Sequence, residues 1–329
     1  MQNGWANPFQ PVPYLFGFRR CQMTSRQPNP QGPDSMPTSQ GAHMFKFMTA
    51  ATAKVVLEHR TLRWSTPRMF NDPFDVQFDL RIEVDKAEVR RLTLQKLWDD
   101  HYGPAPAPPG NPFGHMIHAF RGRFPKWSRE EFEANFGSPI EEGIERGLAS
   151  VPRLHEETRE QMRNSKILCL TSSPENILMW THYAGQHSGV ALRFRDVPEM
   201  DSPWKEAKPV NYVDEIPLLA DNEALSNIMS GRQSFDMPTM INRLVYTKST
   251  AFAYEQELRL YSGAGRNPDA DFEDLGFHHL ELDAVIFGSR TPPNDRAEIL
   301  GLLNQGYPHA EILQARLEPK HFAMTINLG

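Results

Sequence analysis

The sequence predicts an α+β fold with a helical insertion, and three features of its 329 residues lead to this prediction. Short segments with apolar residues at alternate positions, the period of strands, occur on both sides of the middle of the chain. Residues from about 85 to 165 instead combine many charges with helical spacing of apolar residues. A hydrophobic content of 39% is enough for a sizeable core. We therefore expect one α+β domain over 44–329, interrupted by that insertion.

Composition limits the class of protein further. Residues 1–43 are rich in Pro, Gln, Asn and Ser, which predicts a disordered, Pro-rich tail. A net charge of −6 does not indicate nucleic acid as a partner, although a local basic patch would be compatible with one. Two cysteines cannot form a disulfide framework, and no apolar run reaches the roughly 20 residues that span a bilayer. We expect a cytoplasmic protein without a membrane segment.

The ordered part is expected to open with a strand, a helix and a second strand. Alternation predicts the first strand over 45–48, and Thr49 is a suitable helix N-cap. The helix buries Ala53, Val56 and Leu57, and the stretch TLRWST follows as a strand. After the insertion, we expect strands over 167–173, 189–195, 208–213, 254–261, 282–288, 310–317 and 322–328. Helices are expected over 174–186, capped by Ser173, over 221–231, and after Pro293, capped by Asn294 or Asp295.

The first stretch that could carry chemistry is FNDPFD at residues 70–75. Asn-Asp-Pro is typical of a turn, because Asp bonds its own backbone and the proline excludes helix at Asp72. The simpler interpretation is a turn in which Asp75 caps or tethers the backbone. In the functional interpretation, Asn71, Asp72 and Asp75 line the mouth of a polar pocket, and the flanking aromatic residues suit a stacked planar ligand.

A second stretch, LTSSPENILMWTHYAG, ends a strand in hydroxyl groups at the start of a helix. Ser172 and Ser173 at a helix N-terminus are suited to an anion or a phosphate. Trp180 and Tyr183, three residues apart, share a helical face, which by default belongs to the core. His182 and His187 lack an obvious third ligand, so no metal is expected.

The third stretch is YEQELRLY at residues 254–261. In a strand, Glu255, Glu257 and Arg259 point to one face, while mainly apolar side chains point to the other. Such an ionic face is either a solvated, salt-bridged edge or a working surface. Two carboxylates on an inward face could serve acid and base catalysis, metal chelation or the stabilisation of a cationic sugar.

Several enzyme classes are excluded by missing motifs. The sequence has no G-x-S-x-G, no P-loop, no H-E-x-x-H and no dinucleotide-binding G-x-G-x-x-G. Serine hydrolases of that type, P-loop nucleotide hydrolases and zincins are therefore not expected.

Taken together, these stretches resemble a large, mainly bacterial protein family of unknown function. The resemblance runs from about Phe45 to Leu303 and includes an aromatic-Lys-aromatic strand, F-N-D-P-F-D, M-W-x-x-Y-A, and a lysine followed by E-x-E-x-R. The lysine of the last motif is Lys248. Phe252 stands before the two acids, where the family usually has Trp, and the first strand carries Phe where Tyr is common.

The order of elements also resembles, more distantly, the ADP-ribosyltransferase fold. That resemblance implies two small mixed or antiparallel sheets with NAD, the substrate, bound between them. It assigns Glu257 to the developing ribose cation and Glu255 to the acceptor. Ser172 or Ser173 would supply the hydroxyl, and Trp180 or Tyr183 would stack on nicotinamide. Lys46 lies where the transferases usually carry Arg or His.

Three hypotheses follow for function. The first is an NAD-consuming, ADP-ribosyltransferase-like enzyme of a bacterial defence or toxin type, which modifies a macromolecular acceptor. The second is a non-catalytic sensor or interaction domain, in which the same residues form a buried structural network. The third is a Mg²⁺-dependent nuclease or phosphodiesterase, which requires Asp72, Asp75, Glu255 and Glu257 to converge near Lys248.

Overall fold

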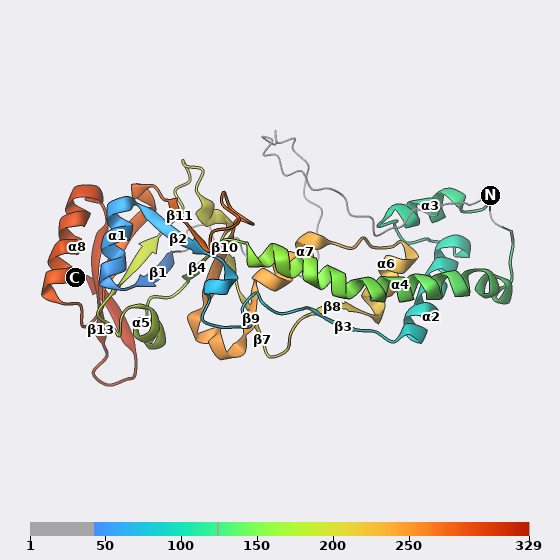
Figure 1. Cartoon of the computed structure of the whole chain (residues 1–329), viewed down its shortest axis with the longest axis horizontal. Helices are drawn as coiled ribbons and strands as arrows, with labels where there is room; N and C mark the ends of the chain where they lie inside the picture. The colour runs from blue at the N-terminus through green and yellow to red at the C-terminus, as the bar shows by residue number, and fades with distance from the viewer. Residues whose placement is uncertain (1–42, 124, 329) are drawn as a thin grey trace. The chain divides into compact units, whose positions relative to one another are not determined.

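The protein is described here from a computed structural model, which covers residues 43–123 and 125–328. All of the predicted tail except His43 lies outside these residues. The α+β class is confirmed, since helices cover a mixed sheet (Figure 1). None of the helices in the described part of the chain is long and apolar enough to span a bilayer.

Within the described residues, ten strands form the main sheet. The pairing is antiparallel except between β12 and β13. The main path runs in the order β11 (Phe272–Gly276), β2 (Thr61–Ser65), β4 (Ile167–Thr171), β1 (Met44–Met48), β5 (Val190–Phe194), β12 (Leu282–Phe287), β13 (Glu311–Leu317) and β14 (Met324–Leu328). A branch adds β10 (Glu257–Tyr261) beside β4, followed by β6 (Lys208–Pro209).

The prediction of two small sheets is therefore wrong. Strand β5 pairs with β1 on one side and β12 on the other, which joins the two halves into one sheet. In β5 and β12 every residue is buried except Arg193 and Asp283, which are partly buried and form an ion pair. Such mainly apolar strands are typical of a sheet that is covered on both faces. Two short parallel pairs stand apart from this sheet: β3 (Arg81–Glu83) with β8 (Leu218–Asp221), and β7 (Asn211–Val213) with β9 (Thr247–Ser249).

Helices cover both faces of the sheet. Helices α1 (Ala50–His59) and α8 (Pro293–Gly306) pack together over a core that includes Leu168 and Leu192. Helix α5 (Ile177–Tyr183) covers the opposite face, where Trp180 packs edge-on against Phe47 with ring centroids 4.9 Å apart. Alternate residues of the central strands thus enter two separate cores.

Helix starts agree with the sequence in one case and differ in two. Thr49 caps α1, since its hydroxyl accepts from the backbone N–H of Thr52, as predicted. Helix α5 begins three residues later than expected, because Asn176, not Ser173, accepts the free backbone N–H groups. Pro292 occupies the cap position of α8, so neither Asn294 nor Asp295 caps it.

The expected insertion is helical. It contains α2 (Lys86–Tyr102), α3 (Pro112–Phe120) and α4 (Arg129–Arg163), which share an apolar core that includes Leu97, Phe132 and Ile144. Helix α6 (Asn222–Ser230), from a later part of the chain, packs against α2. Helix α7 (Met237–Val245) was not predicted from the sequence.

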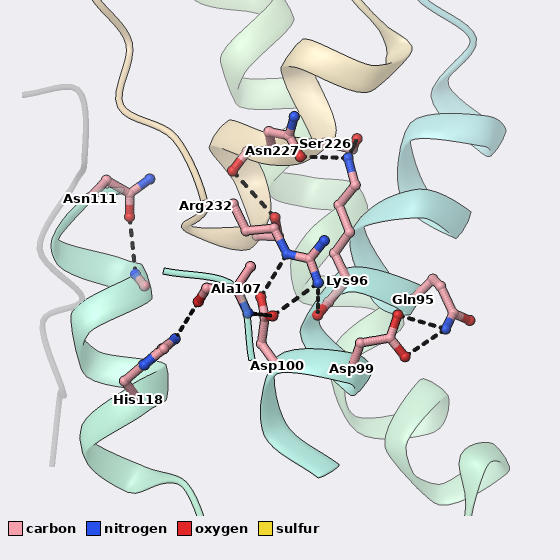
Figure 2. Close-up of polar contacts among 12 residues, drawn as sticks. Gln95, Lys96, Asp99, Asp100, Ala107, Asn111, His118, Ser226, Asn227 and Arg232 are labelled. Atoms are coloured by element: carbon pink, nitrogen blue, oxygen red, sulfur yellow. Dashed lines mark hydrogen bonds and ion pairs between the residues drawn. The ribbon is translucent and has the colours of Figure 1, made fainter. Parts of the chain in front are cut away.

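Polar groups join α2 to the segment that follows α6 (Figure 2). Arg232 donates from Nε and Nη2 to the two oxygens of Asp100, at 2.8 and 2.9 Å, and from Nη2 to the carbonyl of Lys96. The Lys96 ammonium in turn donates to Ser226 and Asn227 of α6. Asp100 is only 3% exposed, so Arg232 compensates a buried charge.

We expect Arg232→Ala to lower the free energy of unfolding by about 3 kcal/mol, because it leaves the Asp100 carboxylate buried without its ion-pair partner. The control is Arg91→Ala, which removes an equally bidentate partner from Glu88 on the exposed side of the same helix. Urea denaturation followed by circular dichroism measures both. Equal losses for the two variants would contradict the role assigned to Arg232.

Candidate functional site

A buried ionic network lies where β10 meets the turn at residues 70–75 and the segment that leads into β10. Its members are all less than 9% exposed, although each carries an ionisable group: Asp75, Lys248, Glu255, Glu257 and Arg259. Three acids and two bases leave one excess negative charge when all are ionised. All five were singled out in the sequence as candidate site residues.

The backbone places the two glutamates differently from the expected strand. Glu255 is the last residue of a short 3₁₀ helix, Thr250–Glu255, and β10 begins only at Glu257. Gln256 between them has a φ of 45°, in the left-handed region, which interrupts the alternation. Glu255 nevertheless joins the network, because Lys248 binds its carboxylate.

The Lys248 ammonium lies at the point where three carboxylates converge. Its Nζ is 2.6 Å from Glu255 Oε2, 3.2 Å from Glu257 Oε2 and 3.3 Å from Asp75 Oδ2. The Phe252 ring covers it from another side, with the centroid 4.8 Å from Nζ. A charged group of the protein itself thus occupies the position that a bound cation would take among these oxygens.

Arg259 binds Glu257 through two parallel hydrogen bonds. Its Nε donates to Oε1 at 2.8 Å and its Nη2 to Oε2 at 2.9 Å. Nη2 also donates to Asp75 Oδ2 at 2.7 Å, and Nη1 donates to the backbone carbonyl of Val245 at 2.6 Å. Arg259 is completely buried, so this fork connects β10 to the end of α7 and to the turn.

The environment shifts the pKa values of the two paired acids in opposite directions. Burial disfavours the charged form of Glu257, but the Arg259 guanidinium and the Lys248 ammonium together outweigh burial and hold the pKa at about 2. For Asp75, burial dominates over Arg259 and Lys248, so its pKa is raised. Asp75 Oδ1 is buried and finds no hydrogen-bond partner in the described residues. The excess negative charge of the network is therefore least stable on Asp75.

Aromatic hydroxyl groups complete the network. Tyr183 of α5 donates to Glu255 Oε1 at 2.7 Å, and the Tyr212 oxygen of β7 accepts from the backbone N–H of Glu257 at 2.8 Å. Burial raises the pKa of Tyr212 to about 12. Tyr183 was predicted as a site residue and is joined to the network, whereas Tyr212 was missed. The parallel pairing of β7 with β9, which places Tyr212 beside Lys248, was the missing information.

Lys46 lies on the other face of the sheet. Phe45 pairs with Thr171, and Cys169 pairs with Arg259, so strand alternation puts Phe45 on the face of Arg259. Lys46 therefore points away from that face, and its Nζ donates to the backbone carbonyl of Cys169 at 2.7 Å.

The other predicted site residues have local roles. Asp72 accepts from the backbone N–H of Phe74 at 2.9 Å, as the turn signal of Asn-Asp-Pro predicts, and Asn71 is exposed. Asp75 was expected to cap or tether the backbone in the simpler interpretation, but its carboxylate pairs with Arg259 and Lys248. Trp180 is completely buried in the core. Ser172 donates to the carbonyl of Gln256 at 3.3 Å, and the Ser173 hydroxyl accepts from the backbone N–H of Glu175.

Metal ligation has little support in this arrangement. In residues 43–123 and 125–328, no group of three or more His, Cys, Asp or Glu side chains is placed to hold a metal ion. The Asp75, Glu255 and Glu257 carboxylates do converge, but on the ammonium of Lys248.

These features define an α+β protein with a buried ionic network at the junction between its sheet and its helices. A family model described as "Protein of unknown function (DUF2971)" matches residues 179–260. The matched stretch contains every network residue except Asp75, and it agrees with the expected resemblance to a family of unknown function. No curated protein and no solved structure matches the chain. The resemblance to the ADP-ribosyltransferase fold stays a prediction.

We expect Glu257 to make stability depend on acid pH. Its folded pKa of about 2 lies below the unfolded value of about 4.3, so its contribution is complete above pH 4.5 and is lost as the pH falls toward 2. The raised pKa of Asp75 acts in the opposite sense and offsets part of this loss. Between pH 5 and 2.5, the free energy of unfolding should therefore fall more steeply in wild type than in Glu257→Gln, by roughly 2 to 3 kcal/mol.

Chemical denaturation at a series of pH values measures this difference. Glu175→Gln serves as the control, because Glu175 is an exposed glutamate outside the buried network. Its profile should follow wild type. A Glu257→Gln profile parallel to wild type would show that Glu257 has an ordinary pKa in the folded protein.

Proposed function

We propose that this protein is a non-catalytic interaction domain, in which the ionic network is a structural junction. The observation that carries the proposal is the complete pairing of Glu257. Both of its oxygens accept from Arg259, one of them also lies beside Lys248, and the side chain is only 4% exposed. A carboxylate that is buried and paired in this way is not presented to a substrate hydroxyl group.

The network also joins segments that lie far apart in the sequence. Asp75 comes from the turn, Arg259 from β10, and Val245 from the end of α7. Directly beside them, Val76 and Leu80 share an apolar cluster with Met162 of α4 and Met240 of α7. The network and this apolar cluster together thus hold the ends of α4 and α7 against the sheet. This supports a role in presenting a binding surface of fixed geometry.

The transferase hypothesis requires a different state of the same residues. Glu257 would have to leave Arg259 in order to contact the ribose of NAD. The buried guanidinium of Arg259 would then lose its bidentate partner. Tyr183 and Glu255 are already hydrogen-bonded to each other, so they too are engaged within the protein. The nuclease hypothesis requires Mg²⁺ to displace Lys248 from three carboxylates.

An assay with labelled NAD and wild-type protein distinguishes these functions. We expect neither NAD hydrolysis nor transfer to a protein or nucleic-acid acceptor, and we expect millimolar Mg²⁺ to leave the melting temperature unchanged.

We also expect Glu257→Gln to lower the free energy of unfolding by about 3 kcal/mol, since it breaks a buried pair. Asp75→Asn is the matched control and should cost less, because burial already disfavours the charge of Asp75.

Two results would contradict the proposal of an interaction domain. If wild type consumes NAD and a folded Glu257→Gln variant does not, the transferase hypothesis replaces the proposal of an interaction domain. Mg²⁺-dependent cleavage of a nucleic acid or a phosphodiester that is lost in folded Asp75→Asn would instead favour the nuclease.

A further inference from the structure

The main sheet has three free edges in the described residues, and two of them are protected against pairing. Strand β11 carries Glu273 and Asp274, and Asp274 forms an ion pair with Arg63 of the neighbouring strand. Strand β6 ends in Pro209, which has no N–H to donate. Charges and prolines are the usual means by which proteins prevent pairing between sheet edges.

Strand β14 has neither kind of protection. Its five residues, MTINL, contain no charge and no proline, and within the described part of the chain it pairs only with β13. Leu328 at its end is 79% exposed. The outer side of β14 therefore offers unpaired backbone groups together with apolar side chains.

The register of the β13–β14 pair determines which backbone groups are free. The N–H of Glu318 donates to the carbonyl of Ala323, so this pair is hydrogen-bonded. Hydrogen-bonded and non-hydrogen-bonded pairs alternate along an antiparallel ladder. Thr325 and Asn327, which pair with Arg316 and Gln314, therefore direct their backbone groups toward β13. The backbone groups of the alternate residues, Met324, Ile326 and Leu328, point outward.

We propose that β14 pairs with β14 of a second copy of this chain, antiparallel and about a two-fold axis that passes between the two Ile326 residues. This register opposes Ile326 to Ile326 of the second copy, and Met324 to Leu328. All three positions have outward backbone groups, so three pairs form about six hydrogen bonds. The two sheets become one continuous sheet across the axis, and the contact is isologous.

Side chains support the same partner. Met324 is buried in the apolar cluster under α5, and Ile326 packs against that cluster. Leu328 has the same strand parity, so in the pair it lies against Met324 of the second copy and extends the cluster across the axis. Because residues 324–328 are neutral, two copies of the strand meet without repulsion between like charges.

Sedimentation velocity of the full chain, over a dilution series from nanomolar to high micromolar, tests the proposal. We expect a reversible dimer in wild type. Leu328→Lys should weaken it at least tenfold, because it places a charge on the apolar face on each side of the axis. Val55→Lys is the matched control: Val55 is also exposed, at 54%, but lies on α1, over the opposite face of the sheet. It should leave the dimer unchanged.

Cysteine pairs test the register itself, in a background with Cys21→Ser. About the proposed axis, Thr325 opposes Asn327 of the second copy as a non-hydrogen-bonded pair, with Cα atoms about 4.5 Å apart. This distance allows a disulfide. The two copies of residue 325 form a diagonal pair about 7 to 8 Å apart, as do the two copies of residue 327. A mixture of the Thr325→Cys and Asn327→Cys variants should therefore form a disulfide-linked dimer on mild oxidation, while neither variant does so alone.

Each other outcome overturns the proposal. A monomer at every concentration rules out the second copy as the occupant of this edge, as does a dimer that is insensitive to Leu328→Lys. Efficient crosslinking of either cysteine variant alone rules out the register centred on Ile326. Thermal melting of each variant confirms that it is folded before it is compared.

Discussion

The pair between Arg259 and Glu257 is the interaction on which this structure most depends. Moving two charges out of water costs several kcal/mol per ion, and only good geometry with additional hydrogen bonds offsets that cost. Here the guanidinium makes two bonds to Glu257, one to Asp75 and one to the carbonyl of Val245. If the arginine moved, the Glu257 and Asp75 carboxylates would stay buried with only Lys248 to offset their charges. The ends of β10 and α7 and the turn are consequently held in one arrangement.

Lys248 determines what chemistry this network can perform. Three carboxylates around one point are usually interpreted as a cation site, and from the sequence alone these acids are compatible with Mg²⁺ as well as with a catalytic glutamate. The lysine ammonium already lies 2.6 to 3.3 Å from all three, and together with Arg259 it offsets two of their three charges. The same acids that indicate an enzyme in the sequence are therefore, in the folded chain, partners of internal bases.

Local signals in the sequence predicted the elements better than their assembly. Thr49 as a cap and the strand pattern near Phe45 depend on neighbouring residues, and both are confirmed. The grouping of Glu255, Glu257 and Arg259 was also predictable, although through an assumed continuous strand. The left-handed conformation of Gln256 breaks that strand, and no local pattern indicates it. Likewise, the side of the sheet that Lys46 faces depends on which strands become neighbours, a long-range property.

The clusters around Arg232 and Arg259 are built on the same principle, which explains why spacing in the sequence could not reveal their full membership. Arg232 and Arg259 each bind one carboxylate through two bonds and also donate to a backbone carbonyl of another segment. In each case, a single planar fork fixes the distance and the angle between two segments. Apolar packing tolerates small shifts between such segments, but a buried fork does not, because a shifted donor leaves a carboxylate unpaired. The arginines therefore contribute mainly to the specificity of the arrangement, and the apolar clusters around them supply most of the stabilising free energy.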